Sequence, residues 1–227
     1  MKIPQEINFK LYLYFILICS LYPSYTHAKQ APWVGTSLSG VRCTGGGQGY
    51  GPFDYTQVAT IGKKHLTIVE SAHFTPKVEN LIAGNTSSTP VGDIDYTLRA
   101  WPNHHRALLS IIRYQLQIKQ KIRQGKLETP PECYLQRAIA FSPQDPAPHS
   151  LFGYYLTKLK KYKQAEKHYL KALELSPNNS KLNYSYSLFL IKLKRYNEAL
   201  KYAKTAYQKG RPPEGLKRKL IKLNVWK

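Results

Sequence analysis

Residues 149–209 of this chain repeat themselves at a period of 34 residues. Residues 152–162 (FGYYLTKLKKY) align with residues 186–196 (YSLFLIKLKRY), and the match continues beyond them. The matched pairs include Leu156 with Leu190, Ala165 with Ala199, and Ala172 with Ala206. A period of 34 with small residues at fixed offsets is typical of a solenoid of helix-turn-helix units. The sequence therefore predicts a mainly α-helical fold.

The period also extends the array toward the N-terminus. Ala138 and Pro143 lie 34 residues before Ala172 and Pro177, so residues 131–141 are predicted to be the second helix of an earlier repeat. The first helix of that repeat starts near His104. The predicted solenoid, 103–227, consists of a degenerate repeat (103–145), two regular repeats (146–179 and 180–213) and a capping helix (214–224). About three repeats plus a polar-faced cap is near the minimum for a stable array.

These residues resemble the tetratricopeptide repeat (TPR) family. The family's signature positions are occupied in order by Gly153, Leu156, Ala165, Tyr169, Ala172 and Pro177, and in the next repeat by Leu190, Ala199 and Ala206. Small residues stand where the paired helices approach closely, so their expected role is packing. The resemblance implies a scaffold that binds a protein or peptide partner on the inner face of each repeat's first helix.

Carrying the family's groove positions onto this sequence gives nine candidate partner-binding residues. They are Ser150, Tyr154, Thr157, Lys158, Lys181, Tyr184, Leu188, Ile191 and Lys192. Tyrosines beside lysines suit an extended peptide or a helix that carries acidic groups. Ordinary solvated surface is the alternative for each of them. The family's carboxylate-clamp pattern is not matched, because Ser185 stands where an asparagine is expected.

Residues 1–28 have the features of a secretory signal peptide. Lys2 and Lys10 precede an 11-residue apolar run, residues 11–21, and Ala28 supplies a small residue at the cleavage site. The run is shorter than the roughly 20 apolar residues that span a bilayer. The sequence therefore predicts a periplasmic or secreted protein with no stable membrane span after cleavage. An uncleaved N-terminal membrane anchor is the alternative.

Two cysteines, Cys43 and Cys133, remain after removal of the predicted signal peptide. In an oxidising compartment two cysteines commonly pair, and this bridge would tie the N-terminal segment to the first helical repeat. Two unpaired, buried cysteines are the alternative.

The net charge of +21 is concentrated in the helical half. From Trp101 onward there are 26 basic and 7 acidic residues, whereas residues 29–100 carry 6 basic and 5 acidic ones. Such a charge attracts polyanions or acidic membrane surfaces. Lysine outnumbers arginine 25 to 9, however, which also fits a general lysine bias rather than a phosphate-binding surface. Secretion argues against a nucleic acid partner.

Residues 29–102 are predicted to form an irregular segment packed on the solenoid, with a glycine-rich loop at residues 45–51. This segment and the start of the next helix hold the one candidate set for metal or acid–base chemistry. It comprises Glu70, His73, Asp93, Asp95, His104 and His105. Adjacent histidines on a helix point about 100° apart and do not easily share an ion. We therefore expect no metal, no cofactor and no catalytic residues, and roles in capping or packing for these histidines.

The whole layout is similar to signal-peptide-bearing TPR proteins of the bacterial envelope, which have segments like residues 51–55 and 95–109. That resemblance brings no known activity. The leading hypothesis is a secreted or periplasmic protein-protein interaction scaffold that binds through the groove. The alternatives are a polyanion or membrane-surface binder acting through the basic helical half, and an enzyme using residues 93–105.

Overall fold

The computed structural model describes residues 30–120 and 127–227. The chain divides into two units, Met1–Gln30 and Ala31–Lys227, and the fold below is that of the second. The predicted signal peptide and residues 121–126 of the predicted degenerate repeat lie outside the described residues. Within the described ranges, no helix is long and apolar enough to cross a membrane. The described residues are mainly helical, and their β-structure is one isolated bridge between Thr36 and Arg42.

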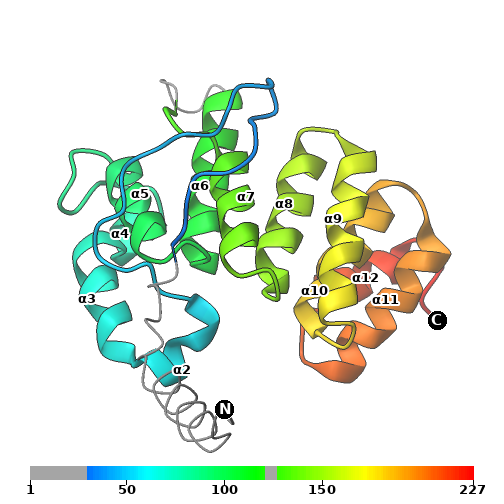
Figure 1. Ribbon diagram of the computed structural model, residues 1–227. Coiled ribbons are helices and arrows are strands. Elements are labelled where there is room, and N and C mark those ends of the chain that lie inside the picture. Colours follow the sequence, from blue (N-terminus) through cyan, green and yellow to red (C-terminus); the bar gives the residue numbers. More distant parts are fainter. Residues whose placement is uncertain (1–29, 121–126) are drawn as a thin grey trace, which may run out of the picture. The chain divides into compact units, whose positions relative to one another are not determined.

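The two regular repeats form the two helix pairs that the 34-residue period predicts (Figure 1). The first pair is α8 (Pro146–Lys158) with α9 (Tyr162–Leu175), and the second is α10 (Ser180–Lys192) with α11 (Tyr196–Lys209). The period extends to backbone details. Asp145 and Asn179 cap the first helix of each pair with their side chains, and Lys160 and Lys194 take positive φ angles of 60° and 62° in the turns. The fold class is therefore confirmed as a TPR-type helical solenoid.

Packing inside the first pair depends on one small and one large residue at facing positions. Gly153 on α8 lies directly against the buried ring of Tyr169 on α9. One period later these positions hold Ser187 and Ala203, both fully buried. Serine therefore replaces the glycine, and alanine replaces the tyrosine. The Ser187 hydroxyl donates a hydrogen bond of 2.7 Å to the carbonyl of Ala199. Both repeats therefore bring their helices close together, with different side chains.

The array begins and ends with less regular units. Helices α6 (His105–Lys119) and α7 (Pro131–Phe141) lie where the degenerate first repeat is predicted, and both pack against α8. The C-terminal helix α12 (Gly215–Lys222) packs against α10 and α11 through Leu216 and Leu220, which are fully buried. It covers the end of the array, as the predicted capping helix would.

The N-terminal segment contains more helix than the irregular segment expected over residues 29–102. Residues 31–54, here called the strap, are irregular, but residues 55–100 are largely helical. These helices are η1 (Tyr55–Gln57), α2 (Val58–Ile61), α3 (Lys63–His73), α4 (Pro76–Glu79) and α5 (Pro90–Ala100). Helix α5 packs against α6. Its buried face includes Asp93 beside Ile94 and Leu98, and a carboxylate on an apolar face weakens the periodic signal of a helix.

The strap runs alongside α5, α6 and α7 (Figure 1), and two of the points that fasten it are buried side chains of α7. A disulfide joins Cys43 to Cys133 on α7, with a Cα–Cα distance of 5.4 Å, which confirms the predicted pairing. The second point is the buried guanidinium of Arg137, also on α7. It donates hydrogen bonds to the carbonyls of Ala31 (2.6 Å) and Leu98 (2.7 Å). Burial lowers the pKa of Arg137 to about 10, so the group remains charged at neutral pH.

Candidate functional site

A groove lies over the first helices of the two regular repeats. Its volume is about 550 Å³, and residues of α8 and α10 form most of its walls. The lining residues, called the groove from here on, are Leu109, Ser150, Leu151, Tyr154, Thr157, Lys158, Lys160, Tyr162, Tyr169, Ser185, Leu188, Phe189, Lys192 and Lys219. Leu109 comes from α6 and Lys219 from α12, so the groove draws on every first helix of the array and on the cap.

Charge in the groove is of one sign. Four lysines line it, at positions 158, 160, 192 and 219, and its lining includes no aspartate or glutamate. These lysines form no ion pair within the part of the chain that the structure describes. The rest of the lining is leucine, aromatic rings and hydroxyls. The groove can therefore receive apolar side chains on its floor while its ammonium groups interact with an anionic group.

Six of the nine predicted partner-binding residues line this groove. They are Ser150, Tyr154, Thr157, Lys158, Leu188 and Lys192. Leu188 is 37% exposed, which is high for a leucine on a helix of this array.

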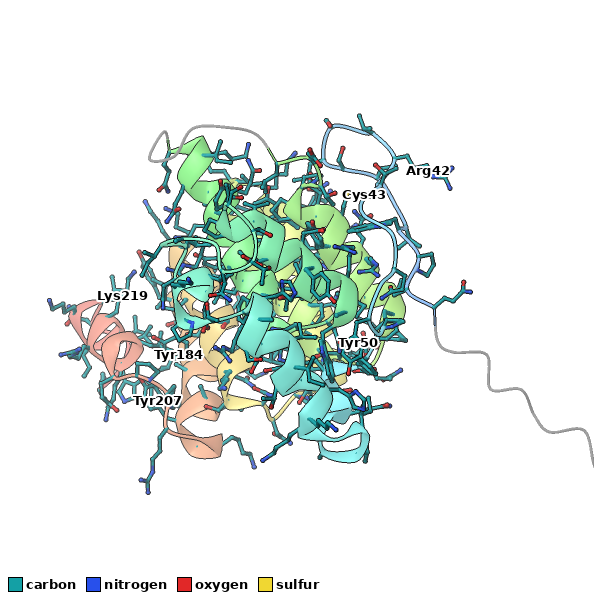
Figure 2. The ribbon with its side chains drawn as sticks, turned by 90° about the vertical axis from the view of Figure 1, so that its left-hand side faces the viewer. Arg42, Cys43, Tyr50, Tyr184, Tyr207 and Lys219 are labelled. Atoms are coloured by element: carbon teal, nitrogen blue, oxygen red, sulfur yellow. A yellow bond between two sulfur atoms is a disulfide. The ribbon has the colours of Figure 1, made fainter. Side chains whose placement is uncertain are left out.

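Three predicted residues lie elsewhere. The side chain of Ile191 is 6% exposed and belongs to the apolar core, so it is not available to a partner. Tyr184 is half-buried and lies on the side of the molecule where Tyr207 and α12 are found (Figure 2). Lys181 is exposed but does not line the groove. Positions early in α10 therefore lie outside the groove, which is formed by the later turns of that helix.

Sequence reasoning missed the contribution of the cap. Lys219 was expected only as part of a lysine-rich helix, because a 34-residue pattern assigns no groove position to α12. Lys160 was missed for a similar reason, since it occupies the turn between α8 and α9 and has a left-handed backbone. The repeated Lys160–Lys194 pair was the signal available in the sequence, but it identifies a turn rather than a binding position.

Contacts within α8 hold the groove side chains in place. The Thr157 hydroxyl donates a 2.7 Å hydrogen bond to the Gly153 carbonyl, one helical turn earlier. The ammonium of Lys158 lies 5.4 Å from the centre of the Tyr154 ring, within the range of a cation–π contact. Partial burial raises the pKa of the Tyr154 hydroxyl, so it stays protonated and able to donate a hydrogen bond at neutral pH.

The candidate acid–base set does not converge on a single point. His104 Nε2 bonds Glu70 Oε1 at 2.9 Å, His105 Nε2 bonds Asp145 Oδ2 at 2.8 Å, and His73 Nδ1 bonds Asp93 Oδ1 at 2.9 Å. Asp95 instead pairs with Arg99 at 2.9 Å. The six residues therefore form separate structural contacts. His73–Asp93 and Asp95–Arg99 lie within the N-terminal segment, His105–Asp145 lies within the solenoid, and His104–Glu70 joins the two.

His104 shows how these contacts work. Its Nδ1 accepts a 3.1 Å hydrogen bond from the backbone N–H of Ala107, which caps α6, so Nε2 carries the proton donated to Glu70. Burial lowers the pKa of His104, although the bond to Glu70 acts in the opposite direction. The ring is fully buried and neutral, as its capping and packing roles require.

Asp93 has a similar structural role at the start of α5. Burial alone would raise its pKa, but hydrogen bonds from Thr86, the Asn85 backbone, His73 and the Ser87 backbone lower it to about 2. The carboxylate therefore stays ionised and holds the loop before α5 against α3.

Comparisons with known proteins agree with the repeat pattern. Tetratricopeptide repeat models match residues 146–179 and residues 168–201. Among solved structures the chain is similar to one described as the crystal structure of MamA, with 16% identity, a TM-score of 0.43, and coverage of 74% of this chain and 85% of that chain. None of the curated protein sequences matches. The matched residues lie on α8 to α11, and this part of the chain carries tetratricopeptide repeats.

Proposed function

We propose that this protein is a periplasmic or secreted interaction scaffold whose groove binds a carboxylate-bearing segment of a protein partner. The repeats support a protein–protein interaction role in general. The observation that carries the finer proposal is the lining of the groove, with four lysines and no acidic residue around an apolar floor. A volume of about 550 Å³ accommodates a few side chains of a peptide or helix rather than a whole domain.

The chemistry favours an acidic, amphipathic segment. Tyr154 and Leu188 offer aromatic and apolar surface beside the buried Phe189. Within residues 30–120 and 127–227, the lysines around them have no carboxylate partner to release before binding. Aromatic anchors on a groove floor typically carry much of the binding energy, while peripheral charges control association rate and specificity. Substitution of the floor residues should therefore mainly raise the dissociation rate constant. Substitution of the lysines should mainly lower the association rate constant.

The compartment is supported by the disulfide between Cys43 and Cys133, since such bonds persist in oxidising environments. The predicted signal peptide is consistent with it. The hydrogen bonds of His104, His105 and Asp93 give these residues structural roles, and we propose no catalytic activity for them.

Site-specific photo-crosslinking in the native host tests the groove. A photoreactive amino acid replaces Tyr154 in the groove, and in a matched control it replaces Leu170 on α9, which is 46% exposed and lies outside the groove. We expect a discrete crosslinked species from position 154 that is absent from position 170. Equal crosslinking from both positions, or none from 154, would contradict the proposal.

A charge test separates specific binding from general attraction. Lys192→Glu changes a groove lysine, and Lys204→Glu changes the net charge equally on the exposed surface of α11. Groove binding predicts that only Lys192→Glu reduces the yield of the crosslinked species.

A second candidate function is attraction to a polyanion or an acidic membrane surface through the C-terminal end. Residues 199–227 contain nine basic residues and one acidic residue. Binding through distributed charge should weaken steeply as salt concentration rises and should respond alike to both lysine substitutions. A partner held on the groove floor should show a shallower salt dependence.

A further inference from the structure

Two histidines in the first regular repeat face one another across the helix pair. His149 lies on α8 and His168 on α9, and their Nδ1 atoms are 3.1 Å apart. The two rings are tilted by 37° with their centres 5.4 Å apart. Both side chains line a second cavity of about 660 Å³, bounded by α7, α8, α9 and strap residues 36–40. This cavity shares no lining residue with the groove.

The pair differs from the other histidines that the structure describes. His65 is bonded to the Tyr50 hydroxyl, and His73, His104 and His105 are each bonded to a carboxylate. His149 and His168 have only each other as hydrogen-bond partners within residues 30–120 and 127–227. Their facing nitrogens allow two arrangements. Either one Nδ1 carries a proton and donates it to the other, or both lone pairs point toward a shared ion.

The distance of 3.1 Å fits a hydrogen bond and also fits the second arrangement. Imidazole nitrogens bind transition metals at about 2.0–2.1 Å. Two nitrogens 3.1 Å apart then subtend an angle of roughly 100° at the metal, between the square-planar and the tetrahedral value. We propose that His149 and His168 form a two-histidine chelating site for a late first-row divalent metal ion, with Cu²⁺ bound most tightly.

The surroundings define the rest of the coordination sphere. A two-ligand site leaves coordination positions open, and here they face the cavity, whose lining includes Lys161, Lys167 and Gln164. Lys171 also acts on His149 by charge repulsion, while Asp145 and Glu174 act on it by attraction. Neighbouring ammonium groups weaken the binding of a cation but favour water or an anion as an additional ligand. We therefore expect micromolar rather than nanomolar affinity.

The affinity order follows from general coordination chemistry. For a nitrogen site, divalent affinity rises from Co²⁺ through Ni²⁺ to Cu²⁺ and falls at Zn²⁺. The metal would join α8 to α9 and should raise the resistance of that repeat to unfolding, because it binds the folded helix pair and not the separated helices.

The test is a titration of the full chain, purified without a histidine tag, with CuCl₂ at pH 7, followed by calorimetry and electron paramagnetic resonance. The variants are His149→Gln, His168→Gln and the double substitution, with His105→Gln as a matched control on a carboxylate-bonded histidine. We expect one equivalent of Cu²⁺ bound with micromolar affinity and with nitrogen hyperfine splitting. That equivalent should weaken by more than about tenfold in each single variant. The His105→Gln control should keep it.

Two results would overturn the proposal. One is a wild-type chain that binds no Cu²⁺ at concentrations up to about 0.1 mM. The other is a double variant that binds the same number of equivalents as the wild type with the same hyperfine pattern. Far-ultraviolet circular dichroism of each variant at the titration temperature identifies any that fail to fold, and the single variants then carry the comparison.

Discussion

Replacement of Gly153 by alanine is the most direct test of how the helix pairs are packed. A Cβ atom at position 153 would lie 2.9–3.0 Å from three atoms of the Tyr169 ring, Cδ2, Cε2 and Cγ. The ring has little room to move. It is 4% exposed, and the rings of Tyr186 and Phe189 lie 5.8 and 5.1 Å from it, centre to centre.

Two opposing effects decide the outcome. Alanine is favoured over glycine inside a helix by about 1 kcal/mol, because glycine has more backbone freedom to lose on folding. Overpacking a tight core contact costs about 1–3 kcal/mol. We therefore expect Gly153→Ala to lower the free energy of unfolding by about 1 kcal/mol, which corresponds to a fall in Tm of roughly 2–4 °C for a chain of this size.

Whether Gly153→Ala lowers or raises the free energy of unfolding should depend on Tyr169. In a Tyr169→Ala background the close contact is gone, so Gly153→Ala should stabilise by about 1 kcal/mol through helix propensity alone. The four chains of this double-mutant cycle are compared by urea unfolding at constant pH, with circular dichroism as the signal. Stabilisation of the same size in both backgrounds would refute the packing argument, because it would mean that the Tyr169 ring does not restrict position 153.

Three other predictions concern His104, the disulfide of the strap and the groove. His104 has a lowered pKa in the folded chain, so the unfolded chain binds more protons below about pH 6.5, and stability should fall as the pH decreases from 7 toward 5. His104→Asn keeps a side chain that can cap α6 but cannot titrate, and the urea midpoint of this variant should depend less on pH over that range. The Cys43→Ser/Cys133→Ser double variant should lose about 2–5 kcal/mol, because the disulfide closes a loop with a sequence separation of 90, and urea unfolding under non-reducing conditions measures the loss. Lys192→Glu should leave the thermal unfolding curve unchanged, because this lysine is exposed, and it should reduce crosslinking from position 154, because the lysine lines the groove. A large fall in Tm would show instead that Lys192 stabilises the fold.

The repeat array was predictable from sequence because its constraints recur. Helix ends, turns and close contacts come back after 34 residues, and the caps Asp145 and Asn179 follow the same period. Each occurrence supports the others, so the two regular repeats could be placed at 146–179 and 180–213 without tertiary information.

The N-terminal segment has no such repetition, and its stability comes from contacts far apart in the sequence. Arg137 reaches carbonyls 106 and 39 residues away, and Asn103 donates to Asp54 and Asp145 from positions 49 and 42 residues away. Burial of an arginine without a carboxylate partner leaves no local pattern. Helix α5 was missed because its buried face includes polar residues such as Asp93 and Thr97.

The groove was predicted in part for a related reason. Positions on α8 followed from the repeat register, but at Ile191 the side chain is buried although the family pattern places it in the groove. The His149–His168 pair was missed because the two residues are 19 positions apart and meet only when α8 and α9 are antiparallel. Two histidines that are level with one another along the axes of the paired helices of one repeat are the signal that could have indicated this pair.

The covering of the first repeat has a consequence for assembly. In Figure 1, α5 lies on one side of α6 and α7, and α8 lies on the other. The surface of α6 that could receive a preceding repeat is therefore occupied by α5, and α12 occupies the corresponding surface after α11. An open solenoid can add copies of itself end to end and grow into a filament. Within residues 30–120 and 127–227 both ends of this array are covered, so a second copy finds no bare repeat face on which to stack.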